Sequence, residues 1–498
     1  MRRLVPRPVL FAILAASWLH PAGVIAQAPE GEVEPPPPEV TSPSPLEARI
    51  AQLEERDRAR DQALNEALSR VDQLERDLNA ARDAADEEEE VDEEAPTGPT
   101  VRPLASLFTR LEHREGYMAL GAGNPGCFPG ANDGDCLRYR AEAGLAIGDL
   151  RVADEVVAAV RFRPQVSGFW SFGTPPSSGG VVHPALGLYE GNLILQLGDA
   201  VRIDAGRIVL NYGDQMVIGA LRWHPAGRSF DGARMHVQPT ANGWWVDLFW
   251  TMLNEGGAGG HGFGDRYFYG AYAALGPLLG EGVQLDAYAL GRQQNDSVDP
   301  TSGAQVDWSL LVHLGARFRY RVEIVDLRLE GGFQTGRQGQ PVGTDAATII
   351  AGHVDGEVGL NLLDDRVRLA AHGFFASGDN PSTAEVEAYD QLFPTAHAFL
   401  GWSDVMGART NVAGGAFHVA GKPLPQLTLS LDVFVFTRPE NAGDAYAGTE
   451  GDVQVLWLPG AGFRVRGMYA LFFPNEGLWG TTDQPVHYIE AEVGFELN

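Results

Sequence analysis

The chain has 498 residues, of which 21% are charged, and it contains 61 glycines and 32 prolines. This turn-rich composition favours strands over long helices. The net charge of −29 argues against nucleic acid as a partner, because nucleic-acid phosphates are bound by clustered lysine and arginine.

Residues 1–26 have the three parts of a secretory signal peptide. Arginines near the start precede an apolar run at 9–19, and small residues follow just before Gln27. The run is shorter than the roughly 20 apolar residues that a membrane-spanning helix needs. We therefore expect the mature chain to begin at Gln27, after export across the inner membrane.

The segment from 27 to 103 is predicted to have three parts. A proline-rich leader at 27–45 should be extended, a coiled coil should occupy 46–85, and an acidic linker should span 86–103. The seam of the coiled coil alternates spacings of three and four and consists of Ile50, Leu53, Leu64, Ala67, Val71, Leu74, Leu78 and Ala81. Such a seam must be buried, so we expect a homo-oligomer in the periplasm. The alternative is a single amphipathic helix lying on the mouth of the domain that follows.

Residues 104–498 repeatedly alternate polar and apolar side chains. Leu137 and Tyr139 fall on one face of an extended strand, whereas Arg138 and Arg140 fall on the other. A soluble β-sandwich could also alternate, with its polar groups outside. Because no later apolar run could span as a helix, an exported chain that crosses a second membrane needs a closed barrel.

We therefore predict an all-β fold, a transmembrane antiparallel β-barrel of about 18 strands in the outer membrane of a Gram-negative cell. The side chains predicted to point toward lipid include Leu137, Tyr139, Phe318, Val493 and Phe495. Connections between strands alternate in length, as barrel hairpins require. The short turns, predicted on the periplasmic side, are 147–153, 276–282, 362–365, 422–426 and 459–462. The longer loops, predicted to face outward, are 171–185, 211–229, 255–264, 296–305, 337–346, 377–404 and 474–484.

Cys127 and Cys136, the only cysteines, lie in the loop between the first two predicted strands. In an exported protein a local disulfide is the favoured interpretation. A zinc site would need two further ligands, and none lie nearby.

No set of residues indicates catalysis, so we do not expect an enzyme. The glycine-rich stretch 256–264 lacks the lysine and the following helix of a phosphate-binding loop. The twelve histidines show no close ligand spacing, so neither a cofactor nor a metal ion is expected. His313 and His372 are assigned to the charged faces of their strands.

The most specific stretch contains short motifs in a fixed order: Gly206-Arg207, Tyr212-Gly213, Trp223, Gly227-Arg228, Phe230-Asp231-Gly232 and Arg234. It resembles the alginate-export family of outer-membrane proteins, and further short motifs extend the likeness over residues 104–480. The resemblance implies a barrel of about eighteen strands with an arginine-lined constriction. An anionic uronate polysaccharide would leave the cell through it.

Candidate pathway residues come from two sources. The resemblance assigns Arg207 and Arg234 to the pathway, with Asp231 as the partner that holds an arginine. Strand alternation adds four further arginines, which are Arg138, Arg140, Arg317 and Arg319. Acids are also predicted to face the lumen, namely Asp204, Asp247, Asp286, Asp326, Glu330, Asp355 and Glu357. The arginines could therefore brace the wall instead of selecting solutes.

The sequence thus predicts an outer-membrane channel for diffusion or export of anionic solutes, with an acidic polysaccharide favoured. Forked guanidinium groups suit carboxylates, and many weak sites allow a polymer to slide. Two alternatives stay open, a porin for small anions such as phosphate and a structural anchor with a sealed barrel. Single-channel conductance separates the three.

Overall fold

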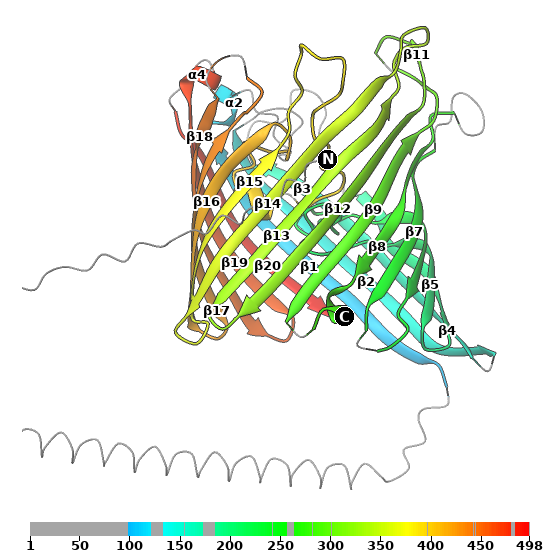
Figure 1. Ribbon diagram of the computed structural model, residues 1–498. Coiled ribbons are helices and arrows are strands. Elements are labelled where there is room, and N and C mark those ends of the chain that lie inside the picture. The colour runs from blue at the N-terminus through cyan, green and yellow to red at the C-terminus, as the bar shows by residue number, and fades with distance from the viewer. Residues whose placement is uncertain are drawn as a thin grey trace, which may run out of the picture. The chain divides into compact units, whose positions relative to one another are not determined.

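The fold is a closed antiparallel β-barrel (Figure 1). Its sheet has 18 strands, and the first strand, β1 (Thr100–Glu115), pairs both with β2 (Gly134–Ala153) and with the last, β20 (Val486–Leu497). The barrel therefore has no free edge, and the predicted closed barrel is confirmed. The computed structural model describes residues 98–120, 133–153, 155–172, 185–241, 243–255, 263–280, 282–299, 301–395, 397–441, 443, 445–479 and 484–497.

The other wall strands follow in chain order, each pairing with the next. They are β3 (Val156–Phe172), β4 (Ala185–Leu197), β5 (Val201–Ile208), β6 (Phe230–Val237), β7 (Trp245–Asn254), β8 (Arg266–Ala274), β9 (Val283–Gln294), β12 (Ser309–Val322), β13 (Val325–Gln338), β14 (Ala347–Leu362), β15 (Val367–Ala376), β16 (Val412–Leu424), β17 (Leu427–Thr437), β18 (Tyr446–Gly460) and β19 (Phe463–Pro474). The remaining elements are not wall strands. They are the hairpin β10 (Ser297–Val298) and β11 (Gln305–Val306) and the short helices α2 (Tyr117–Leu120), η1 (Gly276–Leu278), α3 (His397–Leu400) and α4 (Glu476–Trp479). Among the described residues, no helix is both long enough and apolar enough to cross a membrane.

Alternation along each strand separates a lumen face from an outer face. Arg138 and Arg140 of β2 are each only 2% exposed, because they point into the barrel. Side chains of the opposite parity are largely exposed, as at Leu111 of β1 and Val493 of β20. Leu137, Tyr139, Phe318 and Phe495 share that outward parity in their strands. The strand register predicted from alternation therefore agrees with the structure at these positions.

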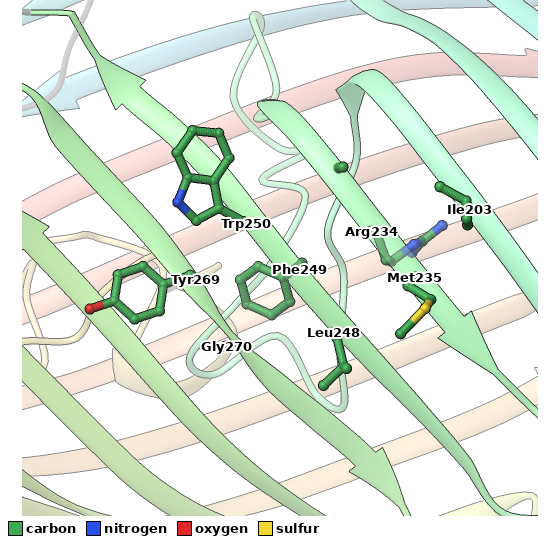
Figure 2. A pocket seen from close by; sticks show the side chains of 9 residues that line it. Ile203, Arg234, Met235, Leu248, Phe249, Trp250, Tyr269 and Gly270 are labelled. Carbon is green, nitrogen blue, oxygen red and sulfur yellow. The ribbon is translucent and has the colours of Figure 1, made fainter.

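The outer face also holds a shallow apolar pocket on β5 to β8, shown in Figure 2. Trp250 and Tyr269 project from neighbouring strands there, with Met235 and Leu248 nearby. Apolar and aromatic side chains on the outside suit a surface surrounded by lipid.

The two ends of the barrel differ in their connections. Ala105 pairs with Leu497, so β1 begins at the same end of the barrel where β20 finishes. Short turns connect the strands at this end, which we call the turn end. Longer connections, with α2 and α4, lie at the opposite, loop end (Figure 1). The predicted short turns join strands at the turn end, and the strand ends that flank the predicted longer loops lie at the loop end.

Two of the longer loops do not face outward as predicted. The connections at 209–229 and 377–411 fold back into the barrel, where Ile218 and Phe393 form a parallel β-bridge. Apolar residues of both loops are buried in clusters with lumen-facing wall residues. Burial of apolar surface therefore draws both loops inward.

Several predictions lie outside the described residues. These are the signal peptide (1–26), the leader (27–45), the coiled coil (46–85) with its homo-oligomer, and residues 86–97 of the acidic linker. Cys136 is disulfide-bonded, whereas its predicted partner Cys127 is outside the described residues, so that pairing stays a prediction.

Candidate functional site

The candidate site is the lumen, where the loops 209–229 and 377–411 meet. Gly219 donates its backbone N–H to the Phe393 carbonyl at 2.8 Å, and Phe393 donates to the Val217 carbonyl at 3.0 Å. Arg228 ties the same junction, because its Nη1 donates to the carbonyls of Phe393 and Pro394. The two loops thus form one hydrogen-bonded partition inside the barrel.

Loop 209–229 is anchored to β1 and β2 by buried arginines. Arg140 Nη1 donates to the carbonyls of Arg222 at 3.2 Å and His224 at 3.1 Å. Arg110 lies over the Trp223 ring, with its guanidinium carbon 3.8 Å from the ring centroid. These arginines satisfy loop carbonyls that would otherwise be buried without donors.

Arg110 and Arg138 share one buried carboxylate, that of Glu112. Glu112 accepts from Arg110 Nε at 2.6 Å, and its Oε1 lies 2.8 Å from Arg138 Nε. All three side chains are at most 2% exposed. Arg138 and Arg140 therefore brace the wall and the loop, which is the alternative role that the mixed charges of the predicted lumen had suggested.

Arg317 and Arg319 of β12 anchor the beginning of loop 209–229. Arg317 Nη2 donates to Asp214 at 2.8 Å, while its Nη1 donates to Asp286 at 2.9 Å. Arg319 Nη1 lies 3.3 Å from Asp214. Arg317 is buried, but nearly half of the Arg319 side chain is exposed, so only Arg319 is open to solutes.

Loop 377–411 is held by a separate set of wall residues. Arg292 makes a forked pair with Asp390, with N–O distances of 3.0 and 2.5 Å. Arg409 donates to the buried Asp355 of β14 at 2.8 Å. Each loop therefore has its own ionic anchors, in addition to the junction at Phe393.

Arg234 lies on the lumen face, as predicted. Its Nε and Nη2 donate to Asp204 of β5 at 2.9 and 2.6 Å, and its Nη1 is 3.6 Å from Asp247 of β7. Tyr212 of loop 209–229 donates to the same Asp247 at 2.7 Å. Arg234 thus braces three strands and the loop, with a minor part of its side chain left exposed.

Arg207 and Asp231 do pair, but the structure corrects their predicted place in the pathway. Arg207 donates to both Asp231 oxygens, at 2.7 and 2.5 Å. Their neighbours Ile208 and Phe230 are buried in the lumen cluster around Tyr212. Since adjacent residues of a strand point to opposite faces, the Arg207–Asp231 pair lies on the outer face, near the loop end.

Five arginines, of which the sequence analysis named only Arg319, have partly exposed side chains in the turn half of the lumen. Each stands beside an acid, with N–O distances from 2.6 to 3.5 Å. The pairs are Arg161 with Glu190, Arg202 with Asp204, Arg319 with Asp214, Arg368 with Asp326, and Arg464 with Glu492. These arginine side chains are 32–47% exposed, but the acids are only 0–23% exposed.

We call these five the turn-half arginines. Their acids lie behind them, so the lumen presents mainly guanidinium groups to water. Two acids depart from this pattern: Glu496 is 41% exposed, and Asp365, which pairs with Arg321 at the turn end, is 52% exposed beside an arginine that is 50% exposed. Net charge along the sequence could not show the arrangement, because it depends on which member of each pair is closer to solvent.

The structure also brings together His372, His418 and Glu357, from three adjacent strands. The sequence gave no sign of this cluster, since its members are 15 and 46 residues apart.

Comparison with known protein families gives a match for this chain. A profile described as alginate export matches residues 192–462, more than half of the chain. The chain belongs to the alginate export family. No curated protein matches it.

Solved porin structures share the fold of this alginate export family member. Pseudomonas aeruginosa OpdK with vanillate is 11% identical, with a TM-score of 0.54, over 80% of this chain and 98% of OpdK. Pseudomonas aeruginosa OccK2 (OpdF) in complex with glucuronate is 11% identical, with a TM-score of 0.53 and the same coverage of both chains. Acinetobacter baumannii OccAB2 is 11% identical, with a TM-score of 0.52, over 79% of this chain and 98% of that porin. At these identities the likeness concerns the fold alone.

Family and fold together identify an outer-membrane β-barrel channel. Short turns of outer-membrane barrels lie on the periplasmic side, so we expect the turn end, where β1 begins, to lie there. The turn-half arginines would then line the periplasmic half of the lumen.

Proposed function

We propose that this channel passes anionic solutes, with an acidic uronate polysaccharide leaving the cell as its main substrate. The observation that carries the proposal is the exposure difference within the five turn-half pairs, where arginines face water and acids lie behind. A solute entering from the periplasm meets these guanidinium groups before it reaches the partition formed by the two loops.

The geometry suits a carboxylated chain. Each guanidinium offers a fork of donors that matches a carboxylate. The turn-half arginines come from five different strands spread along the sheet, β3, β5, β12, β15 and β19. Several weak sites favour passage of a polymer, whereas a single tight site would hold it.

The alginate export family supports export of a uronate polymer. The structural relatives favour the second candidate, uptake of small anions, since one of them was solved with glucuronate and another with vanillate. Both candidates use the same cationic lining, but they differ in the length of solute that blocks the channel.

The test is selectivity of the full chain in planar bilayers, with Arg319→Gln and Arg464→Gln combined. These arginines are the most exposed of the five, and their acids keep other partners, Arg317 for Asp214 and Arg466 for Glu492. The barrel should therefore fold, with reversal potentials in a salt gradient shifted toward less anion selectivity. Block by oligouronates should also weaken.

Arg207→Gln is the control on the outer face, where it removes one arginine charge, and the single variant Arg319→Gln is its matched counterpart in the lumen. Equal selectivity in the wild type, the double variant and the control would contradict the proposal. Block by phosphate or monouronate but not by longer oligouronates would favour small-anion uptake, and a channel without conductance would favour the anchor.

A further inference from the structure

Two lumen histidines present ring nitrogens to each other in the turn half of the barrel. His372 Nδ1 of β15 and His418 Nε2 of β16 are 3.4 Å apart. Glu357 Oε2 of β14 lies 3.7 Å from the same His418 Nε2. The ligand atoms of all three residues lie within 4.8 Å of one another.

The opposite nitrogen of each ring faces a carboxylate. His372 Nε2 is 3.0 Å from Asp355 Oδ1, and His418 Nδ1 is 2.7 Å from Asp432 Oδ1. An ionised carboxylate only accepts hydrogen bonds, so each ring places its N–H toward its aspartate. The converging nitrogens are then both lone pairs, and at 3.4 Å they repel unless a cation lies between them.

We propose that His372, His418 and Glu357 bind a divalent transition-metal ion, with Zn²⁺ as the best match. Bonds of 2.0–2.1 Å in a tetrahedral site separate two ligand nitrogens by about 3.3 Å, close to the observed spacing. A carboxylate behind each imidazole is the usual outer shell of a metal-bound histidine. Three protein ligands leave a fourth position for water or for a solute carboxylate.

The surrounding charges permit a cation. Glu357 also pairs with Arg368 at 2.6 Å through its other oxygen and lies 3.7 Å from Arg328. With Arg409, three guanidinium groups face four carboxylates in this network, those of Asp326, Asp355, Glu357 and Asp432. The network without an ion therefore carries a net negative charge, which a divalent cation reverses only to +1.

The ligand types select among metals. Two imidazoles and one carboxylate suit zinc, cobalt, nickel or copper, whereas calcium and magnesium prefer an all-oxygen shell. A bound ion would link β14, β15 and β16 through their lumen faces, independently of whether the channel carries polymer or small anions.

The experiment is metal titration of the folded full chain in detergent after removal of metals by a chelator. We expect Zn²⁺ calorimetry to give one tight site, and Co²⁺ to give the absorption of a tetrahedral complex. His418→Gln should abolish both signals. Asp432→Asn, which leaves all three ligands in place, should weaken binding about 10–100-fold.

His236→Gln is the matched control. His236 also pairs with an aspartate, Asp247 at 2.5 Å, but its other nitrogen faces Gln238 at 3.5 Å instead of a second imidazole. This variant should bind zinc like the wild type. Failure of the folded wild type to bind either metal, or equal affinity in His418→Gln, would overturn the proposal and leave a shared proton between the two rings.

Discussion

The two halves of the lumen use arginine differently. Toward the loop end, Arg110, Glu112 and Arg138 are almost fully buried against the inward loop. Toward the turn end, Arg319 and Arg464 are 47% and 41% exposed. Buried charges cannot contact a passing solute, so they stabilise the partition, whereas the half-exposed arginines are the ones that we propose act on solutes. The number of lumen arginines therefore says little about selectivity without their exposure.

The largest expected effect is the loss of stability when the buried ion-pair cluster around Glu112 is broken. Glu112 also lies 3.2 Å from Arg114 Nη2, so Glu112→Ala leaves Arg110, Arg114 and Arg138 without their shared carboxylate. This should lower the free energy of unfolding by about 3–5 kcal/mol. Urea titration of the detergent-folded barrel measures this loss. Asp231→Ala, which breaks the exposed outer pair, should cost less than about 1 kcal/mol. Similar losses in both variants would show that burial does not distinguish the pairs.

Release of the inward loop is the next effect. Arg140→Ala removes the hydrogen bonds to the carbonyls of Arg222, His224 and Pro225, each of which costs about 1–3 kcal/mol when its buried partner stays unsatisfied. We expect faster hydrogen exchange over 219–228 and a higher single-channel conductance. Arg140→Lys, with fewer donors, should be intermediate. Unchanged exchange in the alanine variant would mean that the loop is held elsewhere.

Acid should weaken the same loop through His224. Burial, and then the charges of Arg138 and Arg110, lower the pKa of His224 to about 4, and its Nδ1 accepts the Ala226 N–H at 3.2 Å. Because the folded pKa lies below the unfolded value of about 6.5, this contribution is complete above pH 6.5. It is lost as the pH falls toward 4.

Conductance recorded from pH 7 down to pH 4 measures this loss. We expect it to rise in the wild type and to stay flat in His224→Asn, whose amide oxygen can still accept the Ala226 N–H. The same rise in both proteins would assign the acid effect to other groups.

The smallest expected effect is the salt dependence of the anion selectivity that the half-exposed arginines provide. Selectivity from the turn-half arginines should shrink between 0.1 M and 1 M salt, because the screening length falls from about 10 Å to about 3 Å. Reversal potentials at equal salt ratios but different absolute concentrations measure it. Selectivity that does not depend on salt would point to a steric filter instead of these charges.

Alternation predicted the wall well because a strand between lipid and a polar lumen must separate its side chains by parity. Arg138, Arg140, Arg317 and Arg319 all point inward for this reason. Arg207 was assigned to the lumen because the family resemblance identified its motif but did not show which face of the strand the side chain occupies. Its strand is only eight residues long and carries polar and apolar residues on both faces, so its pattern was weak.

The contents of the lumen could not be predicted from the sequence. Nothing local shows that 209–229 and 377–411 fold inward, since glycine, proline and asparagine are equally common in loops that face water. The histidine cluster likewise depends on register among three strands, which fixes neighbours far apart along the chain. Exposure within each ion pair is a property of packing, not of residue type.

The junction at Phe393 also constrains the order of assembly. Arg228 reaches across 165 residues to Phe393, so this contact closes a loop far longer than any strand hairpin and should form later than the hairpins. The strands between them, β6 to β15, must be paired first. The nascent barrel would then enter the membrane around a water-filled interior, and the partition would close only after the hairpins are in place.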